Sequence, residues 1–172
     1  KQINSNGQIN FAGMNFEMVF CKDKNLTKLY ETYGNINNIE VPETYQTIWD
    51  EINLPIQNNK LDVNGITNKE TRQTILSGLS KRAYYLTRVC ELFERKKICE
   101  VGTAEGWQFY NFCQYSLENN GVVTSCDPRD VRSEKYKEKY GDIANFINGT
   151  SKDISELDDN VDFDFFYIDG LH

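Results

Sequence analysis

Residues 98–106 read Ile-Cys-Glu-Val-Gly-Thr-Ala-Glu-Gly and join a short apolar run to a helical pattern. Gly102 and Gly106 allow a tight turn and a close approach between the backbone and a ligand. The helix predicted from 107 to 117 would present free N–H groups to an anion such as a carboxylate. Glu100 is placed either to accept a hydrogen bond from a ligand ammonium or to order the loop. Taken alone, the segment fits equally well a purely structural turn between strand and helix.

From this turn onward, short apolar runs alternate with helical segments. The predicted strands cover residues 98–101, 122–126, 144–147 and 163–168, and the predicted helices cover 107–117, 133–140 and 152–157. Such alternation is typical of an α/β fold with a Rossmann-like parallel sheet and helices on both faces. We expect the spatial strand order 3-2-1-4, with right-handed crossovers. Gly121 is expected to give the first of these helices a left-handed cap.

The chain divides near residue 66. After Thr67, apolar residues recur every three or four positions, which predicts a helix of about 25 residues with one buried stripe. Residues 1–66 hold twelve of the nineteen Asn residues and no motif that carries chemistry. A strand or hairpin at 11–20 and a helix at 44–52 are expected there. We interpret residues 1–66 as a mainly helical and irregular extension, a lid or docking segment, and 67–172 as one α/β domain.

Composition narrows the classes of function. The net charge of −7 argues against a nucleic-acid binder, which needs a basic surface. No apolar stretch reaches the roughly 18 residues of a membrane span, and a small-molecule substrate fits better. The five cysteines are odd in number and lack C-x-x-C spacing, so neither a disulfide framework nor a zinc site is indicated. A reducing, cytoplasmic setting is expected.

Polar residues follow the other three predicted strands. Asp127 comes 21 residues after Gly106, a spacing suited to binding ribose hydroxyls, although Asp127-Pro128 also favours a simple bend. Ser151 either caps the next helix or contacts an adenine edge. Asp169 lies at the carboxyl end of the fourth strand, where open α/β sheets bind ligands. His172, the only histidine, is either structural or catalytic.

Together, these motifs resemble those of class I S-adenosylmethionine-dependent methyltransferases, over about residues 69–172. The resemblance implies that residues 67–172 form a Rossmann-like domain that binds this cofactor. It implies that the glycine motif holds the methionine part, that Asp127 holds the ribose, and that the segment around Ser151 lies beside the adenine. The residues of the glycine motif are Glu100, Gly102, Thr103 and Gly106.

The ending Tyr-Ile-Asp-Gly-Leu-His is similar to a subgroup that includes magnesium-dependent sugar O-methyltransferases. That resemblance implies Asp169 as a ligand of Mg²⁺ and His172 as the general base. We therefore expect methylation of a hydroxyl on a sugar or another small molecule. Mg²⁺ would lower the pKa of that hydroxyl, and His172 would take its proton near neutral pH.

The sequence departs from this family in one respect. The family sheet has seven strands, whereas this sequence reaches only a fourth, so we expect a fragment or part of a split enzyme with an incomplete metal site. A homo-oligomer or a further C-terminal segment would cover the open edge of the fourth strand. Two alternatives stay open: a non-catalytic cofactor-binding or assembly module, and a nicotinamide-dependent oxidoreductase, against which the absence of G-x-G-x-x-G counts.

Overall fold

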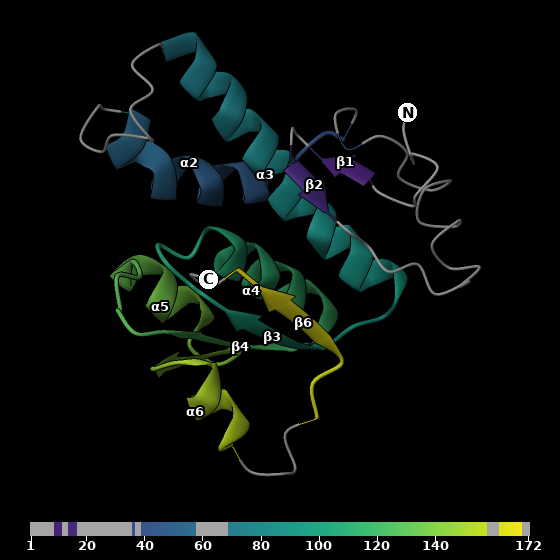
Figure 1. The fold of residues 1–172 in the computed structure, drawn as a ribbon, viewed down its shortest axis with the longest axis vertical. Helices are drawn as coiled ribbons and strands as arrows, with labels where there is room; N and C mark the ends of the chain where they lie inside the picture. Colours follow the sequence, from purple (N-terminus) through teal and green to yellow (C-terminus); the bar gives the residue numbers. More distant parts are fainter. Residues whose placement is uncertain are drawn as a thin grey trace.

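The computed structural model describes residues 9–11, 14–16, 36, 39–57, 69–157 and 162–169. Its strands are β1 (Ile9–Phe11), β2 (Met14–Phe16), β3 (Lys97–Val101), β4 (Val122–Asp127), β5 (Ala144–Asn148) and β6 (Phe165–Ile168). Its helices are α2 (Glu43–Gln57), α3 (Lys69–Leu92), α4 (Trp107–Asn119), α5 (Glu134–Tyr140) and α6 (Ser151–Ser155). Figure 1 shows their arrangement. No described helix is long and apolar enough to cross a membrane.

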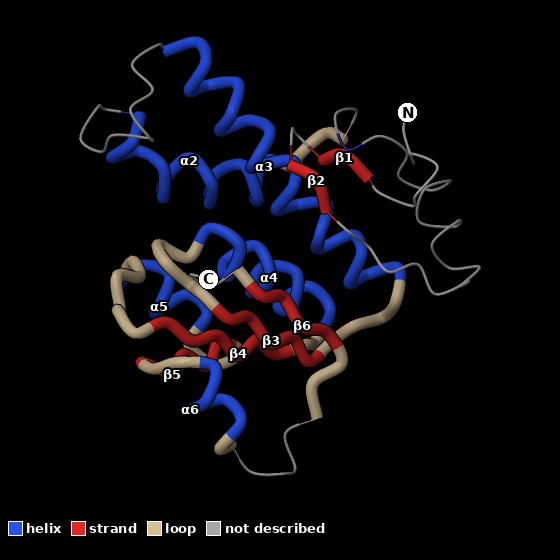
Figure 2. The backbone as a smooth tube through the Cα atoms, viewed as in Figure 1, coloured by secondary structure: helices blue, strands red, loops and turns tan. Residues whose placement is uncertain are grey.

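Strands β3 to β6 form one sheet in the order β5-β4-β3-β6 (Figure 2). Each neighbouring pair is parallel. The predicted order 3-2-1-4 and the α/β fold are confirmed. Val101 of β3 pairs with Cys126 of β4 and with Ile168 of β6. The carboxyl ends of these three strands are therefore level with one another, and the loops that follow them meet at one edge of the sheet.

Helices cover both faces of the sheet, as right-handed crossovers require. Helix α4 lies on one face, and α6 lies on the other (Figure 1). Helix α5 is on the same side as α4, because the rings of Tyr136 and Tyr140 contact Tyr110 of α4. Connections β3-α4-β4 and β4-α5-β5 thus run in one direction, and the chain returns through α6 to add β6 on the other side of β3.

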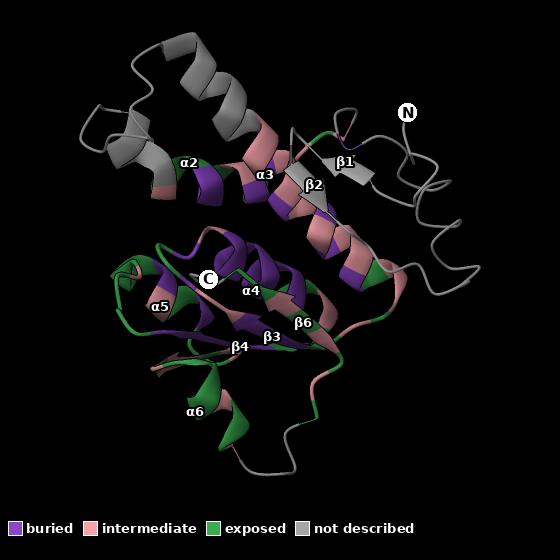
Figure 3. Ribbon diagram, viewed as in Figure 1, coloured by how far each residue is buried: buried purple, intermediate pink, exposed green. Residues whose placement is uncertain are grey.

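Helix α4 forms the centre of the core (Figure 3). Every residue from Gln108 to Ser116 is buried, because the sheet covers one side of the helix and α2 and α3 cover the other. Phe109 and Phe112 pack in one apolar cluster with Ile98 of β3 and Val123 of β4. The predicted left-handed cap lies one residue earlier than expected. Asn120, not Gly121, has a positive φ of 55°.

Helix α2, the α-helix described in the N-terminal part, packs directly on helices α4 and α5 of the α/β domain. Tyr45 of α2 donates a hydrogen bond to Glu118 of α4 at 2.8 Å. Glu51 of α2 accepts hydrogen bonds from Tyr136 of α5 at 2.6 Å and from Lys135 at 2.7 Å. β1 and β2 form an antiparallel pair within residues 9–16, slightly before the position expected for a hairpin.

Strand β6 has one apolar face open to solvent. Phe165 packs against the core, and the rings of Phe165 and Tyr167 each contact Phe112 edge to face. Phe166 and Ile168 point the other way and are 60% and 66% exposed. Among the described strands, β6 pairs only with β3.

Candidate functional site

The turn after β3 lies where the ends of β4 and β6 meet. The Gly102 amide donates to the Cys126 carbonyl oxygen at 2.9 Å, and the Asp169 amide donates to the Val101 carbonyl oxygen at 2.8 Å. These bonds continue the ladder past the ends of the strands. They bring Asp127, which follows Cys126, and Asp169 to either side of the glycine turn, as follows from the strand order β5-β4-β3-β6.

Three residues of the turn have left-handed backbone conformations. Gly102 has a φ of 95°, Gly106 a φ of 93°, and Ala104, which carries a Cβ, a φ of 44°. A Cβ on Gly106 would lie 2.6 Å from Cε2 of the Tyr110 ring. Gly106 is thus required both for its backbone conformation and for close packing against α4.

Asp127 holds the turn in this shape. Its carboxylate accepts from the Ala104 amide at 2.9 Å through Oδ2, and from the Arg129 amide at 2.9 Å through Oδ1. The second bond is the two-residue bend that Asp127-Pro128 predicted. The first was not predicted, because it depends on the pairing of β3 with β4. Asp127 therefore shapes the site; the expected contact with a ribose remains a prediction.

Glu100 is a buried acid directly beneath the turn. It is 1% exposed, and Ser125 of β4 donates to its Oε2 at 2.5 Å. The Ser125 hydroxyl also shares a hydrogen bond with the Thr103 hydroxyl at 2.6 Å. Burial raises the pKa of Glu100 to about 8, against the lowering effect of the Ser125 hydrogen bond, and the charges of Asp169 and Asp127 raise it further. At pH 7 most Glu100 carboxyls are therefore protonated.

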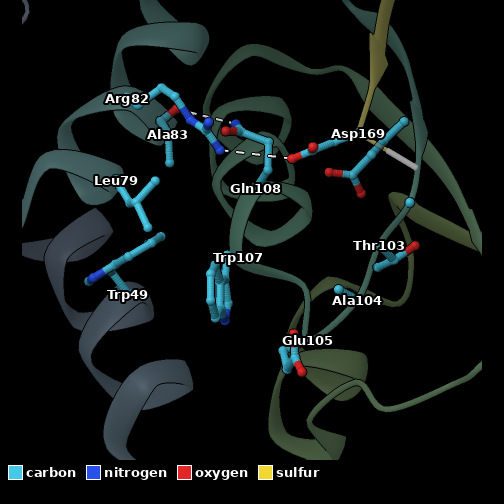
Figure 4. Close-up of a pocket in the computed structure, with 12 residues that line it drawn as sticks. Trp49, Leu79, Arg82, Ala83, Thr103, Ala104, Glu105, Trp107, Gln108 and Asp169 are labelled. Carbon is cyan, nitrogen blue, oxygen red and sulfur yellow. Dashed lines mark hydrogen bonds and ion pairs between the residues drawn. The ribbon is translucent and has the colours of Figure 1, made fainter. Parts of the chain in front are cut away.

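A cavity of about 180 Å³ opens beside the turn (Figure 4). Of the predicted site residues, Glu100, Gly102, Thr103 and Asp169 line it. Ala104 and Glu105 of the same turn also line it. Sequence reasoning missed the part of the wall that comes from α2, α3 and the start of α4. These residues are Trp49, Leu79, Arg82, Ala83, Trp107 and Gln108. Leu79 and Ala83 belong to the apolar stripe predicted for the helix after Thr67, but no pattern in the sequence indicates that this stripe reaches the glycine turn.

Several polar atoms of the cavity wall have no hydrogen-bond partner. Among the described residues, Gln108 Oε1, Trp107 Nε1 and Arg82 Nε are buried and unpaired. Buried polar atoms in folded proteins are nearly always satisfied, so each of these is a candidate contact for a bound molecule. Together with the acid Glu100, they provide both donors and acceptors for a polar ligand.

Asp169 has neighbours that do not suit a metal ligand. Its Oδ2 accepts from the Tyr167 hydroxyl at 2.9 Å and lies 3.8 Å from Nη2 of Arg82. A guanidinium repels a second cation at the same carboxylate. Within the described ranges, no group of three His, Cys, Asp or Glu side chains could hold a metal ion. The residues described here do not fit the expected Mg²⁺ site, and His172 lies outside them.

Ser151 does not cap the following helix. The N-cap of α6 is Thr150, which forms a reciprocal capping box with Asp153, and Ser151 is the exposed first residue of the helix. The Gly149 amide donates to the Asp127 carbonyl oxygen at 3.0 Å, so this loop begins beside the end of β4. The proposed contact between Ser151 and an adenine stays a prediction.

The fold described above also occurs in a known methyltransferase. Residues 99–172, somewhat under half of the chain, match the family model described as "Methyltransferase domain". The search of curated proteins gave no match. Among solved structures, the chain is similar to the SAH-bound Podospora anserina methyltransferase PaMTH1, with a TM-score of 0.55 and 12% identity. The alignment covers 90% of this chain and 62% of the Podospora protein. This chain thus has the fold of a methyltransferase, and its segment 99–172 matches a methyltransferase domain.

Proposed function

We propose that this chain binds S-adenosylmethionine and takes part in transferring its methyl group to a hydroxyl of a sugar or another small molecule. The observation that carries the proposal is the cavity beside the glycine turn, lined by Glu100 and Asp169 and closed by α2 and α3. The match of residues 99–172 to a methyltransferase-domain model supports the same chemistry.

The proposed cofactor contacts follow the order of the strands. The turn from Gly102 to Gly106 faces the methionine part, and Glu100 accepts from its ammonium. Asp127, at the end of the neighbouring strand, accepts from the ribose hydroxyls, and Ser151 lies on the adenine side. A ligand ammonium beside Glu100 favours the ionised carboxylate, so cofactor binding would lower the raised pKa of Glu100.

The chemistry requires a hydroxyl held in line with the methyl group and a group that takes its proton. When bound, S-adenosylmethionine supplies a methyl group on a sulfonium. In the proposed reaction a C–O bond forms, the C–S bond breaks and the proton leaves the hydroxyl. Asp169, whose side chain is 58% exposed, would orient the hydroxyl, and His172, three positions later, would accept the proton. The remaining catalysis is positioning.

Calorimetric titration with S-adenosylhomocysteine tests the proposal. The wild-type chain should bind it, and Asp127→Ala should weaken binding by about 1–3 kcal/mol, the typical loss of a hydrogen bond to a charged group. Asp142→Ala removes an exposed carboxylate after α5 and is the matched control. Equal affinities in all three folded proteins would remove Asp127 from the cofactor site, and no binding to the wild type would refute the proposal.

A further inference from the structure

One end of the cavity holds a guanidinium with an unpaired Nε and, beside it, an unpaired amide oxygen. Arg82 of α3 and Gln108 of α4 lie next to each other there, with Asp169 opposite them (Figure 4). Arg82 Nε and Gln108 Oε1 are buried and have no hydrogen-bond partner among the described residues. A buried donor or acceptor that is left unpaired has lost its hydrogen bonds to water without gaining a partner, which is unfavourable. The unpaired Arg82 donor and the unpaired Gln108 acceptor therefore indicate a ligand that offers an acceptor to Arg82 and a donor to Gln108.

Gln108 is held in one orientation. Its Nε2 donates to the Ala83 carbonyl oxygen of α3 at 3.2 Å, and the residue is only 8% exposed. Because the amide nitrogen is fixed by that bond, Oε1 is the atom left for a ligand. An amide oxygen accepts only, so its partner must carry an N–H or O–H group.

Arg82 is the only cation among the described residues that line the cavity. Its side chain is 20% exposed, and its Nη2 lies 3.8 Å from Asp169, beyond hydrogen-bond distance. Asp169 already accepts from the Tyr167 hydroxyl, and Glu100 is mostly protonated at pH 7. The guanidinium thus keeps donors for an anion, and its planar fork suits a carboxylate.

We propose that Arg82 binds a carboxylate in this cavity, while Gln108 Oε1 accepts from an N–H or O–H group beside that carboxylate. This inference rests on the proposed function and adds α3 to the binding machinery. The shared chemistry is a carboxylate flanked by a donor. Two molecules of the reaction could carry it: the cofactor, through its amino-acid end, or the methyl acceptor, if it is a hydroxy acid.

Binding measurements on Arg82→Met distinguish the two sources. If the carboxylate belongs to the cofactor, the variant should bind S-adenosylhomocysteine about 10- to 100-fold more weakly than the wild type. Its affinity for 5′-methylthioadenosine, which lacks the amino-acid end, should stay the same. If the carboxylate belongs to the acceptor, both affinities should be unchanged. Saturation-transfer NMR on the S-adenosylhomocysteine-saturated protein should then show lactate or 4-hydroxybenzoate bound to the wild type and not to the variant.

Arg88→Met is the matched control. Arg88 is on the same helix and also has a buried, unpaired Nε, but it pairs with Glu91 and does not line the cavity. Arg82→Lys should restore part of the binding, because the charge returns without the planar fork. Thermal unfolding of each variant checks that it is folded.

The inference is overturned if Arg82→Met binds both nucleosides and both acids as the wild type does, or if Arg88→Met loses as much. A wild type that binds no S-adenosylhomocysteine would refute the proposed function instead. In that case, titrating the wild type and Arg82→Met with lactate and 4-hydroxybenzoate, without nucleoside, would still test whether Arg82 binds a carboxylate.

Discussion

Replacing Glu100 by Gln should stabilise the ligand-free protein, and increasingly so as the pH rises. The carboxyl has a native pKa of about 8, against 4.5 as the ordinary value. The folded state holds the Glu100 proton more tightly than the unfolded state does. The contribution of Glu100 to the free energy of unfolding is therefore fully present below about pH 4.5 and is lost as the pH rises towards 8. A glutamine side chain at this position does not ionise, so the stability of the variant should not fall with pH for this reason. Its amide oxygen can still accept the hydrogen bond from Ser125.

The magnitude follows from the difference between the two pKa values. At about 1.4 kcal/mol for each pH unit, the interval from 4.5 to 8 corresponds to at most about 5 kcal/mol. Between pH 5 and pH 7, the same relation gives about 2–3 kcal/mol. This is a large part of the total stability of an ordinary domain, about 5–15 kcal/mol.

Urea unfolding of the wild type and Glu100→Gln at pH 5, 6, 7 and 8 measures the effect. The difference in unfolding free energy should grow by about 2–3 kcal/mol from pH 5 to pH 7, in favour of the variant. Glu105→Gln, at an exposed position of the same turn, is the control. A difference that stays constant with pH would show that Glu100 is already ionised in the folded protein, and the reasoning from burial would be wrong.

Two further predictions concern packing. Gly106→Ala should lower stability by about 1–3 kcal/mol and weaken S-adenosylhomocysteine binding, because the new Cβ meets the Tyr110 ring and the positive φ is strained; an unchanged melting temperature would contradict this. Tyr136→Phe removes the hydrogen bond to Glu51 that ties α5 to α2, and it should cost about 0.5–1.5 kcal/mol in chemical unfolding without changing nucleoside affinity. A loss of affinity there would mean that α2 shapes the cavity through this contact.

The parallel sheet could be predicted because its signals are local and repeated. Each strand is a short apolar run, the first three are each followed by a helical pattern, and right-handed crossovers leave few strand orders. The capping predictions at helix ends were wrong, because a neighbouring residue can take the capping position instead. Asn120, not Gly121, takes the left-handed conformation at the end of α4. A Cβ on Gly121 would lie 2.7 Å from the Lys96 carbonyl oxygen, so glycine is needed there because the two backbone segments pass close to each other.

The candidate site could be predicted only where it follows the strands. Glu100, Asp127 and Asp169 could be predicted because they lie at or near the carboxyl ends of strands. Parallel pairing brings these ends together at one edge of the sheet. The wall supplied by Arg82 and Gln108 could not be found in this way. Its position depends on how α3 crosses the start of α4, and the sequence around Arg82 is that of an ordinary amphipathic helix.

The pairing of β6 with β3 has a consequence for the order in which the site assembles. Ile98 pairs with Val123 of β4, 25 positions away, but also with Phe165 of β6, 67 positions away. Closing the longer loop costs about 0.9 kcal/mol more in chain entropy. We therefore expect β3, α4 and β4 to form the folding nucleus and β6 to join late. The glycine turn is then in place first, and the wall that carries Asp169 is the last part of the cavity to be completed and the first to open.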